Sequence, residues 1–357
     1  MRVVVVDDSA VVRGLIAASL EKDPDIEVVA TAANGRIAVD GLAAWDPDVV
    51  ILDIEMPVMD GMTALPLLLA ISPDVKIIIA STLTLRGAEI SLKALAAGAA
   101  ECMAKPQAAS LRGADEFRRE LVEKVKALGQ GRRRRSTVAR PTAAPVVRKP
   151  PPVPAVVTLR AMSAEIPQAI AIASSTGGPQ ALFKVSPALK NLRQPIFITQ
   201  HMPPTFTTLL ADHLGKLTGR PAREAADGMA VEAGSTYVAP GDFHMLIERE
   251  KDGFRLRLSK AAPENFCRPS ADPMLRSLVA CYGRRLLCVV LTGMGQDGLE
   301  GCRAAVAAGA GVVAQNEATS VVWGMPGAVA TAGLCSQVLP IDEIGPLVER
   351  LAQGTNR

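Results

Sequence analysis

The sequence has few aromatic side chains, few histidines and no long apolar run. Aromatic residues make up 3% of the 357 positions, which leaves too few stacking partners for a protein that binds single-stranded nucleic acid. Nowhere do about 18 apolar residues follow one another, and the opening MRVVVVDDSA lacks the layout of a signal peptide. We therefore expect a cytoplasmic protein that binds no nucleic acid and does not insert into a membrane.

The cysteines are scattered, with no Cys-x-x-Cys pair and no histidine at metal-ligand spacing. This pattern predicts buried, reduced thiols. The six positions are Cys102, Cys267, Cys281, Cys288, Cys302 and Cys335.

Positive charge is concentrated in one segment. The formal net charge is +3, but residues 131–160 alone carry eight basic side chains, no acidic ones and six prolines, so the rest of the chain sums to −5 (3 − 8). Such a segment buries too little apolar surface to fold, and proline keeps it extended. We assign residues 129–165 to a linker. The basic run 132–135 is also compatible with contact to nucleic acid or an acidic surface, but a solvated spacer is the favoured interpretation.

On both sides of the linker, short apolar runs alternate with segments of helical period. In the N-terminal part the runs are VVVVD, EVVATA, DVVILD, KIIIAS and AECMAK. Beyond Ile166 they are QAIAIAS, PIFITQ, RRLLCVVLTGMG and AGVVAQN, interrupted by a hairpin-like region from Tyr237 to Leu258. The pattern predicts an α/β protein with a (βα)5 domain over residues 1–128 and a doubly wound, mostly parallel α/β domain over residues 166–357. Chemistry in such sheets lies at the carboxyl ends of the strands.

In the first domain these strand ends are acidic. Asp7 and Asp8 follow the first run and Asp53 ends the third. Three converging carboxylates raise one another's pKa unless a divalent cation neutralises them, and Mg²⁺ suits such oxygen ligands. Ser81 and Lys105 stand at two further strand ends. Taken singly, an Asp after a strand is more often a helix N-cap and a Lys-Pro pair is more often a turn.

The combination of DD, LDIEMPVMDG, Ser81 and Lys105-Pro106 resembles the receiver domain of two-component response regulators. The resemblance covers residues 1 to about 128. It implies that Asp53 accepts a phosphoryl group and that Asp8 binds Mg²⁺ directly. It also implies that Asp7 acts on the metal through water and that the Glu55 carbonyl faces it.

The same resemblance assigns two switch residues. Ser81, which replaces the threonine usual in the family, would donate a hydrogen bond to the phosphoryl oxygen, and Lys105 would pair with it. The Lys105-Pro106 peptide is a candidate for the cis form, which is accessible to X-Pro bonds. Phosphorylation adds nearly two negative charges and three acceptors, enough to draw both side chains inward. This domain is expected to be a switch.

The C-terminal part is too large and too rich in strands for a DNA-binding module of the helix-turn-helix kind. It contains all three histidines. His213 lies in a helical pattern and is expected to be a surface or packing residue, whereas His244 lies in a loop and could help to shape a site. His201 directly follows an apolar strand, and Asp297 lies in a glycine-rich loop after another. A serine nucleophile needs such a base, oriented by a carboxylate.

Two serines compete for the role of nucleophile. Ser174 continues the strand AIAIAS, whereas Ser175 stands at its exit before Thr176-Gly177-Gly178, where glycines permit a tight turn. The helix that begins near Gly178 would direct its amide groups at developing negative charge. Considered alone, SSTGG could equally be a helix cap.

Three motifs in this half, SSTGGPQAL, ITQHMPPTFT and LTGMGQDG, closely resemble the catalytic domain of the chemotaxis protein-glutamate methylesterases, and APGDFHM and NFCRPSADPML between them extend the match. The resemblance spans about residues 166–350. It implies that Ser175 is the nucleophile, His201 the general base and Asp297 its orienting carboxylate. Thr176 and the Met294 amide would support the oxyanion. Ala173-Ser174 stands where the family usually has Gly-Ala.

The implied reaction is hydrolysis of a glutamate γ-methyl ester on methyl-accepting chemotaxis receptors, with deamidation of particular glutamines by the same acyl-enzyme route. No metal is expected in that reaction, and Mg²⁺ belongs to the receiver domain alone. A chemotaxis histidine kinase would be the phosphodonor. Phosphorylation of Asp53 would then release a receiver that covers the Ser175 site.

Two alternatives remain open from the sequence. One is a phosphorylation-controlled interaction module whose triad is vestigial. The other is a serine hydrolase of this fold that serves a sensory array outside chemotaxis.

Overall fold

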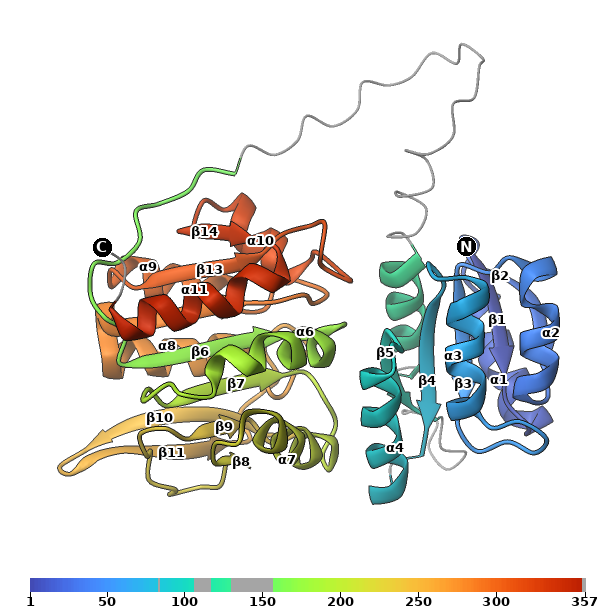
Figure 1. Cartoon of the computed structure of the whole chain (residues 1–357), viewed down its shortest axis with the longest axis horizontal. Helices are drawn as coiled ribbons and strands as arrows, with labels where there is room; N and C mark the ends of the chain where they lie inside the picture. Colours follow the sequence, from blue (N-terminus) through green and yellow to red (C-terminus); the bar gives the residue numbers. More distant parts are fainter. Residues whose placement is uncertain (83, 106–116, 130–156, 355–357) are drawn as a thin grey trace, which may run out of the picture. The chain divides into compact units, whose positions relative to one another are not determined.

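The chain folds into two compact units, Met1–Pro154 and Ala155–Arg357, in the computed structural model (Figure 1). The structure describes residues 1–82, 84–105, 117–129 and 157–354. Most of the predicted linker, residues 130–156, lies outside the described residues. Each unit is an α/β fold with its own sheet, as the sequence predicts.

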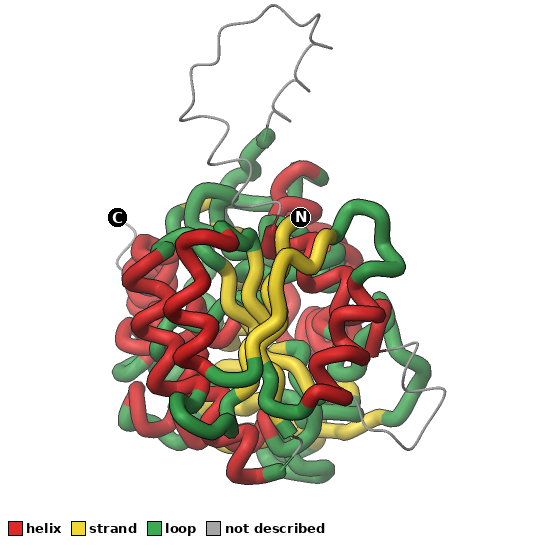
Figure 2. The backbone as a smooth tube through the Cα atoms, turned by 90° about the vertical axis from the view of Figure 1, so that its right-hand side faces the viewer, coloured by secondary structure: helices red, strands yellow, loops and turns green. Residues whose placement is uncertain are grey.

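The N-terminal unit contains a parallel sheet of five strands in the order β2-β1-β3-β4-β5. The strands are β1 (Arg2–Val6), β2 (Glu27–Ala32), β3 (Val49–Asp53), β4 (Lys76–Ser81) and β5 (Glu101–Ala104). Each coincides with one of the apolar runs of the sequence. Figure 2 shows helices on both sides of the strands. Because both faces are covered, β1 and β3 are almost fully buried, which explains their continuous apolar character.

Side-chain caps start the first four helices of this unit. The helices are α1 (Ala10–Leu20), α2 (Gly35–Trp45), α3 (Gly61–Ile71), α4 (Leu85–Ala96) and a last helix through residues 117–129. Ser9 caps α1, and Asp60 caps α3 by accepting a hydrogen bond from Thr63 N at 2.7 Å. The acidic residues at the ends of β1 and β3 are therefore not the side chains that cap the following helices.

The C-terminal unit contains a seven-stranded sheet in the order β14-β13-β12-β6-β7-β9-β8, whose strand pairs are all parallel. Its central strands are again the predicted apolar runs. The strands are β6 (Ala169–Ser174), β7 (Ile196–Gln200), β8 (Ala222–Glu224), β9 (Thr236–Val238), β12 (Leu286–Val290), β13 (Gly311–Gln315) and β14 (Gln337–Leu339).

A separate hairpin, β10 (His244–Glu250) with β11 (Gly253–Ser259), interrupts the parallel pattern. The sequence predicts a hairpin-like region from Tyr237 to Leu258, and the structure places its start in β9 of the main sheet instead, because β9 pairs in parallel with β7. Helices α6 (Gly178–Val185), α7 (Phe206–Thr218), α8 (Ala271–Tyr282), α9 (Leu299–Ala307), α10 (Met325–Thr331) and α11 (Ile341–Gln353) complete the unit.

The end of the predicted linker contacts the C-terminal unit. Arg160 N donates to the Cys335 carbonyl at 2.9 Å, and Val157 packs against the core. No helix in the described part of the chain combines the length and the apolar character needed to cross a membrane.

Candidate active site and candidate metal site

In the N-terminal unit, the carboxylates of Asp7, Asp8 and Asp53 offer ligand atoms that all lie within 4.8 Å of one another. They come together because β1 and β3 are neighbours in the sheet and end at the same edge. Asp7 and Asp53 are buried, whereas Asp8 is exposed. The sequence predicts this grouping, and the structure brings the three side chains together.

One ammonium group serves the two buried carboxylates. Lys105 Nζ lies 2.9 Å from Asp7 Oδ2 and 2.7 Å from Asp53 Oδ2. Burial raises the pKa of Asp53, and the charge of Asp7 raises it further, while Lys105 offsets only part of this. One ammonium group against two buried carboxylates, with the exposed Asp8 nearby, leaves an excess of negative charge at this edge.

The buried oxygens at this edge suit a hard cation. Among the described residues, the ion pair with Lys105 is the only polar contact of the buried atoms Asp7 Oδ2 and Asp53 Oδ2. Oxygen ligands of this kind fit Mg²⁺, which needs only one or two carboxylates and keeps several waters. The assignment of Asp7, Asp8, Asp53 and the Glu55 carbonyl as ligands stays a prediction. The Glu55 side chain is exposed and lies 3.7 Å from Arg86 Nε.

The two predicted switch residues lie at the ends of neighbouring strands, Ser81 as the last residue of β4 and Lys105 directly after β5. Ser81 ends β4, is 3% exposed, and donates its hydroxyl to the Thr82 carbonyl at 3.3 Å. Lys105 N donates to the Ser81 carbonyl at 2.8 Å, which fixes the backbone of the lysine beside the serine. The predicted cis peptide at Lys105-Pro106 includes Pro106, which lies outside the described residues.

In the C-terminal unit, strand register places Ser175 beside His201. Ser174 pairs with Gln200 at the carboxyl ends of β6 and β7, and His201 N donates to the Ser174 carbonyl at 3.2 Å. The next residue of each strand is Ser175 and His201. Adjacent strands lie about 4.8 Å apart, so the two side chains leave the sheet as neighbours.

The two candidate serines differ in their surroundings. Ser174 is fully buried and donates its hydroxyl to Gln200 Oε1 at 2.7 Å. Gln200 Nε2 in turn donates to the Ser175 carbonyl at 2.9 Å. Ser175 is half-buried. The hydroxyl of Ser174 is therefore committed to a structural hydrogen bond inside the turn.

Glycines make the turn after β6 possible. Gly177 has a φ of +75°, which L side chains rarely adopt. A Cβ on Gly178 would lie 1.9 Å from Gln200 Oε1, and a Cβ on Gly293 would lie 2.9 Å from the Ser175 Cβ. Gly178 thus lets the turn pack against Gln200, and Gly293 lets the loop after β12 approach Ser175.

His201 and Asp297 form a hydrogen-bonded pair, with 2.7 Å between Nε2 and Oδ2. The side chains are 13% and 2% exposed. Burial lowers the pKa of His201, but hydrogen bonds with Asp297 and Cys267 outweigh it and raise the pKa to about 10. Burial raises the pKa of Asp297, but hydrogen bonds from His201 and Ser270 lower it to about 2. Both shifts favour an imidazolium beside a carboxylate.

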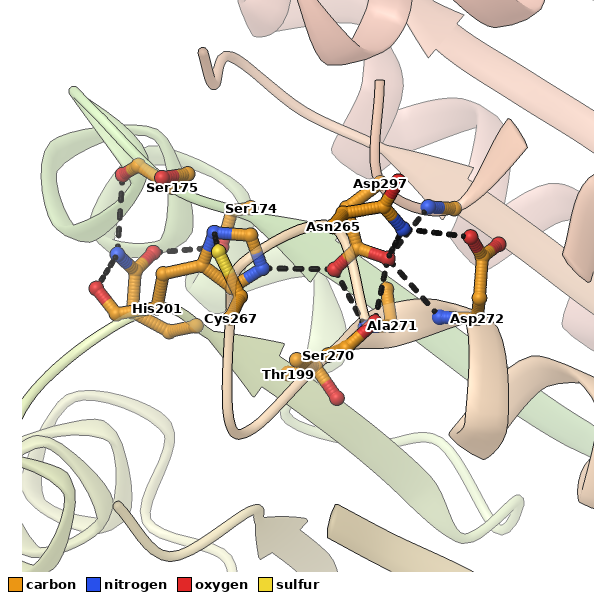
Figure 3. Close-up of polar contacts among 12 residues, drawn as sticks. Ser174, Ser175, Thr199, His201, Asn265, Cys267, Ser270, Ala271, Asp272 and Asp297 are labelled. Carbon is orange, nitrogen blue, oxygen red and sulfur yellow. Dashed lines mark hydrogen bonds and ion pairs between the residues drawn. The ribbon is translucent and has the colours of Figure 1, made fainter. Parts of the chain in front are cut away.

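Asp297 is held by a group of donors that the sequence analysis missed (Figure 3). Its Oδ1 accepts from the Ser270 hydroxyl at 2.6 Å and from Asn265 Nδ2 at 3.0 Å, and its Oδ2 accepts from Ala271 N at 2.6 Å. The backbone amides of Asp272 and Gly298 also donate to Oδ1. The motif NFCRPSAD was the available signal in the sequence. Its residues follow no helical or strand periodicity, so the sequence does not reveal which of them contact Asp297. These contacts fix the carboxylate that faces the imidazole.

Among the described residues, the Ser175 hydroxyl is not one of the hydrogen-bond partners of the His201 ring, which are Asp297 and Cys267. Nδ1 instead lies 3.4 Å from Cys267 Sγ. Catalytic hydrogen bonds are often long in enzymes without substrate, so this geometry is compatible with a triad. The roles of Ser175, His201 and Asp297 stay predictions.

The two predicted oxyanion residues occupy different places. Thr176 is buried, and its carbonyl accepts from the Thr292 hydroxyl at 2.9 Å, which ties the turn to the loop after β12. Met294 is half-buried in that loop, one residue beyond Gly293. The contribution of either backbone amide to an oxyanion hole stays a prediction.

The other two histidines lie outside this pair. His213 lies in α7 and packs against Phe183, with ring centroids 4.5 Å apart. His244 begins β10, is 1% exposed, and accepts a hydrogen bond from Ser270 N at 3.2 Å through Nδ1. Because Ser270 contacts Asp297, His244 helps to hold the loop that positions the carboxylate.

Family models match both units. The response regulator receiver domain matches residues 3–113, and the CheB methylesterase matches residues 170–348. The chain thus combines a receiver domain with a methylesterase-type domain. It belongs to the CheB methylesterase family.

Full-length relatives support this membership. The chain is 54% identical to the protein-glutamate methylesterase/protein-glutamine glutaminase 1 of Paramagnetospirillum magneticum, over 99% of this chain and 96% of that protein. It is 55% identical to the corresponding protein of the group 2 operon of Rhodospirillum centenum, over 98% and 94%. The crystal structure of the CheB methylesterase catalytic domain of Thermotoga maritima covers 52% of this chain and 98% of that domain, with a TM-score of 0.51 and 38% identity.

Proposed function

We propose that the protein hydrolyses glutamate γ-methyl esters on chemoreceptors, with Ser175 as nucleophile, and that it deamidates particular receptor glutamines at the same site. The observation that carries this proposal is the His201–Asp297 hydrogen bond of 2.7 Å, formed directly beside Ser175 at the ends of adjacent strands. The names of the full-length relatives supply the substrate class.

The hydrogen bonds assign a role to each ring nitrogen of His201. Nε2 is engaged by the Asp297 carboxylate, so a neutral imidazole carries its proton on Nε2 and presents the Nδ1 lone pair. Nδ1 is then the atom that accepts the Ser175 proton as the hydroxyl oxygen attacks the ester carbonyl. The imidazolium returns the proton to the departing methanol oxygen, and water attacks the acyl-enzyme by the same route.

The buried carboxylate stabilises the charged intermediate. Proton transfer places a positive charge on a ring that is only 13% exposed, next to the charged Asp297. The negative oxygen of the tetrahedral intermediate needs donors of its own, and we assign them to backbone amides near Thr176 and Met294. Removing one oxyanion donor typically costs about 10²–10³ in rate.

The choice of Ser175 over Ser174 rests on burial and bonding. Ser174 is fully buried and its hydroxyl donates to Gln200 Oε1, so it is engaged within the fold. Ser175 is half-buried and adjoins the loop that carries Met294. Ser174 would have to break a buried hydrogen bond in order to attack.

We assign phosphorylation to Asp53 in the receiver domain, with a chemotaxis histidine kinase as donor. Mg²⁺, held by Asp7, Asp8, Asp53 and the Glu55 carbonyl, would neutralise charge on the phosphoryl group. Lys105 lies 2.7 Å from Asp53 Oδ2, and Ser81 lies on the adjacent strand, so both can meet the new phosphoryl oxygens. We infer that this change relieves inhibition of the methylesterase domain by the receiver, in a cytoplasmic enzyme.

Methanol release from methylated receptor tests the proposal. The full-length protein should release methanol, and Ser175→Ala should abolish release while Ser174→Ala retains it. Loss of release on substitution of Ser174 alone would contradict the choice of nucleophile. If the wild-type chain releases no methanol either with or without acetyl phosphate as phosphodonor, the result would favour an interaction module with a vestigial triad.

Regulation is tested separately with a fragment. The Thermotoga maritima relative was crystallised as an isolated catalytic domain, which supports expression of residues 157–357 alone. Relief of inhibition predicts that this fragment is more active than the unphosphorylated full chain. Equal or lower activity of the folded fragment would contradict inhibition by the receiver.

A further inference from the structure

Cys267 Sγ lies next to the His201 ring nitrogen that we assign to the Ser175 proton. Its Sγ lies 3.4 Å from Nδ1, while Nε2 lies 2.7 Å from Asp297 Oδ2 on the other side of the ring. Figure 3 shows the ring between the sulfur and the carboxylate. Thiol, imidazole and carboxylate therefore form one continuous hydrogen-bonded chain, which is the arrangement that activates cysteines in other sites.

A tight turn fixes the cysteine there. Cys267 N donates to the Glu264 carbonyl at 2.9 Å, and the two residues between them, Asn265 and Phe266, have φ values of 51° and 62°. The amide of Asn265 donates to Asp297 Oδ1 at 3.0 Å. One turn therefore contacts both the carboxylate and, through Cys267, the imidazole. The thiol is held at Nδ1 by the same element that holds the charge partner of the ring.

Cys267 is also the most accessible of the six thiols. It is half-buried, whereas the other five are buried. Burial raises the pKa of Cys281 and Cys335, the latter to about 12, which keeps those sulfurs protonated. A small reagent in solution therefore meets one thiol that is both reachable and next to a base.

The imidazole can take the proton of this thiol. The hydrogen bonds with Asp297 and Cys267 raise the pKa of His201 despite its burial, so the ring holds an added proton well. When the sulfur attacks an electrophile, a neutral ring can accept the thiol proton at Nδ1, 3.4 Å from Sγ, and this frees the thiolate, the reactive form of cysteine.

We propose that Cys267 is an oxidation site for hydrogen peroxide, and that its sulfenic acid switches the hydrolase off. The thiolate sulfur attacks one peroxide oxygen, the S–O bond forms as the O–O bond breaks, and the leaving hydroxide takes the proton from His201 to become water. Sulfur is oxidised and peroxide is reduced to water. A thiol reductant reverses the modification through a mixed disulfide.

The loss of activity rests on the proposed function and follows from geometry. Nε2 is committed to Asp297, so Nδ1 is the remaining nitrogen for the Ser175 proton. A sulfenic acid on Cys267 adds an oxygen next to Nδ1 and donates its O–H there. Ser175 then has no base, although its own side chain is unchanged.

The chemical part of the proposal is tested on the full-length chain without any esterase assay. After a short exposure to hydrogen peroxide, dimedone trapping and peptide mass spectrometry should locate the sulfenic acid at Cys267. Because His201 Nδ1 lies within reach of the thiol and can take its proton during the reaction, iodoacetamide should alkylate Cys267 about tenfold faster in the wild type than in His201→Gln. Ser175→Ala, a matched control in the same site, should alkylate at the wild-type rate.

These measurements separate the two hypotheses. Label at another cysteine, no label, or an alkylation rate in a folded His201→Gln variant equal to that of the wild type would overturn the assignment. Thermal unfolding of each variant identifies a rate change that comes from unfolding. If Cys267 reacts as expected but the wild type releases no methanol, the proposed function fails and the oxidation site stands.

The regulatory part is tested by methanol release. Peroxide should lower release by the wild type at least about tenfold, as expected for loss of a general base, and dithiothreitol should restore it. Cys267→Ala should show activity that peroxide does not lower. Peroxide inhibition of equal size in Cys267→Ala would overturn the switch. Methanol release that persists in Ser175→Ala and disappears in the double variant Ser175→Ala/Cys267→Ala would overturn it as well, because Cys267 would then be the nucleophile.

Discussion

Replacing Asp297 with asparagine should disable His201 while leaving the shape of the site almost unchanged. Oδ1 of Asp297 accepts from the Ser270 hydroxyl, Asn265 and two backbone amides, so the single oxygen of an asparagine would remain on that side. Its NH₂ group would then face His201 Nε2, at the position where Oδ2 now lies 2.7 Å away. It can only donate to Nε2, which moves the ring proton to Nδ1.

The magnitude follows from that change of tautomer. A histidine protonated on Nδ1 cannot accept the Ser175 proton, and the negative charge that stabilises the imidazolium is lost as well. The equivalent substitution in serine proteases lowers kcat by about 10⁴, and we expect about 10³–10⁴ here, or about 4–5 kcal/mol of transition-state stabilisation. The new NH₂ also opposes the Ala271 amide, now 2.6 Å from Oδ2, at a cost of about 1–3 kcal/mol in the free energy of unfolding.

The assay is methanol release by Asp297→Asn against the wild type, with thermal unfolding measured on both proteins. Ser175→Ala is the matched control, because it removes the nucleophile and leaves the dyad intact. A folded Asp297→Asn protein that keeps its activity within about threefold of the wild type, less than 1 kcal/mol, would refute the role of Asp297 in orienting the base.

Further predictions concern pH, metal binding and the serine turn. The raised pKa of His201 means that the neutral, basic form accumulates only as pH rises, so kcat/KM should increase with pH through an apparent pKa above the ordinary value of about 6.5; a flat profile from pH 6 to 9, corrected for uncatalysed hydrolysis, would contradict this. Calorimetric titration should show that Asp53→Asn weakens Mg²⁺ binding at least about tenfold, whereas Lys105→Ala, which removes a competing cation, should not weaken it. Gln200→Ala removes the acceptor of the buried Ser174 hydroxyl and should lower the free energy of unfolding by about 1–3 kcal/mol. If Gln200→Ala lowers the free energy of unfolding by the same amount in a Ser174→Ala background, that hydrogen bond is not the cause.

The fold could be predicted from sequence where burial imposes a simple pattern. The strands β1, β3, β6 and β12 are covered on both faces and therefore read as continuous apolar runs, so their positions were found. The strand β9 has only three residues and pairs far from its neighbours in sequence, which is why the region from Tyr237 was assigned to a hairpin. Local pattern carries no information on such non-local pairing.

The site was predictable to the extent that strand ends determine it. Ser175 and His201 directly follow neighbouring strands. Active sites of α/β proteins lie at the carboxyl ends of strands, so reactive side chains at these positions are candidates from the sequence alone. The hydrogen-bond donors to Asp297 were not predictable. Asn265 and Ser270 lie in an irregular loop whose course depends on two consecutive positive φ values. The contact of Cys267 with His201 was missed for the same reason, and the scattered cysteines gave no cause to single it out.

The most direct test of the central claim is methanol release from methylated receptor by the wild-type chain and by Ser175→Ala, each measured with and without acetyl phosphate. We predict release by the wild type, an increase when the phosphodonor is added, and no release by folded Ser175→Ala in either condition. Release by Ser175→Ala at the wild-type rate would contradict a hydrolase built on Ser175, His201 and Asp297.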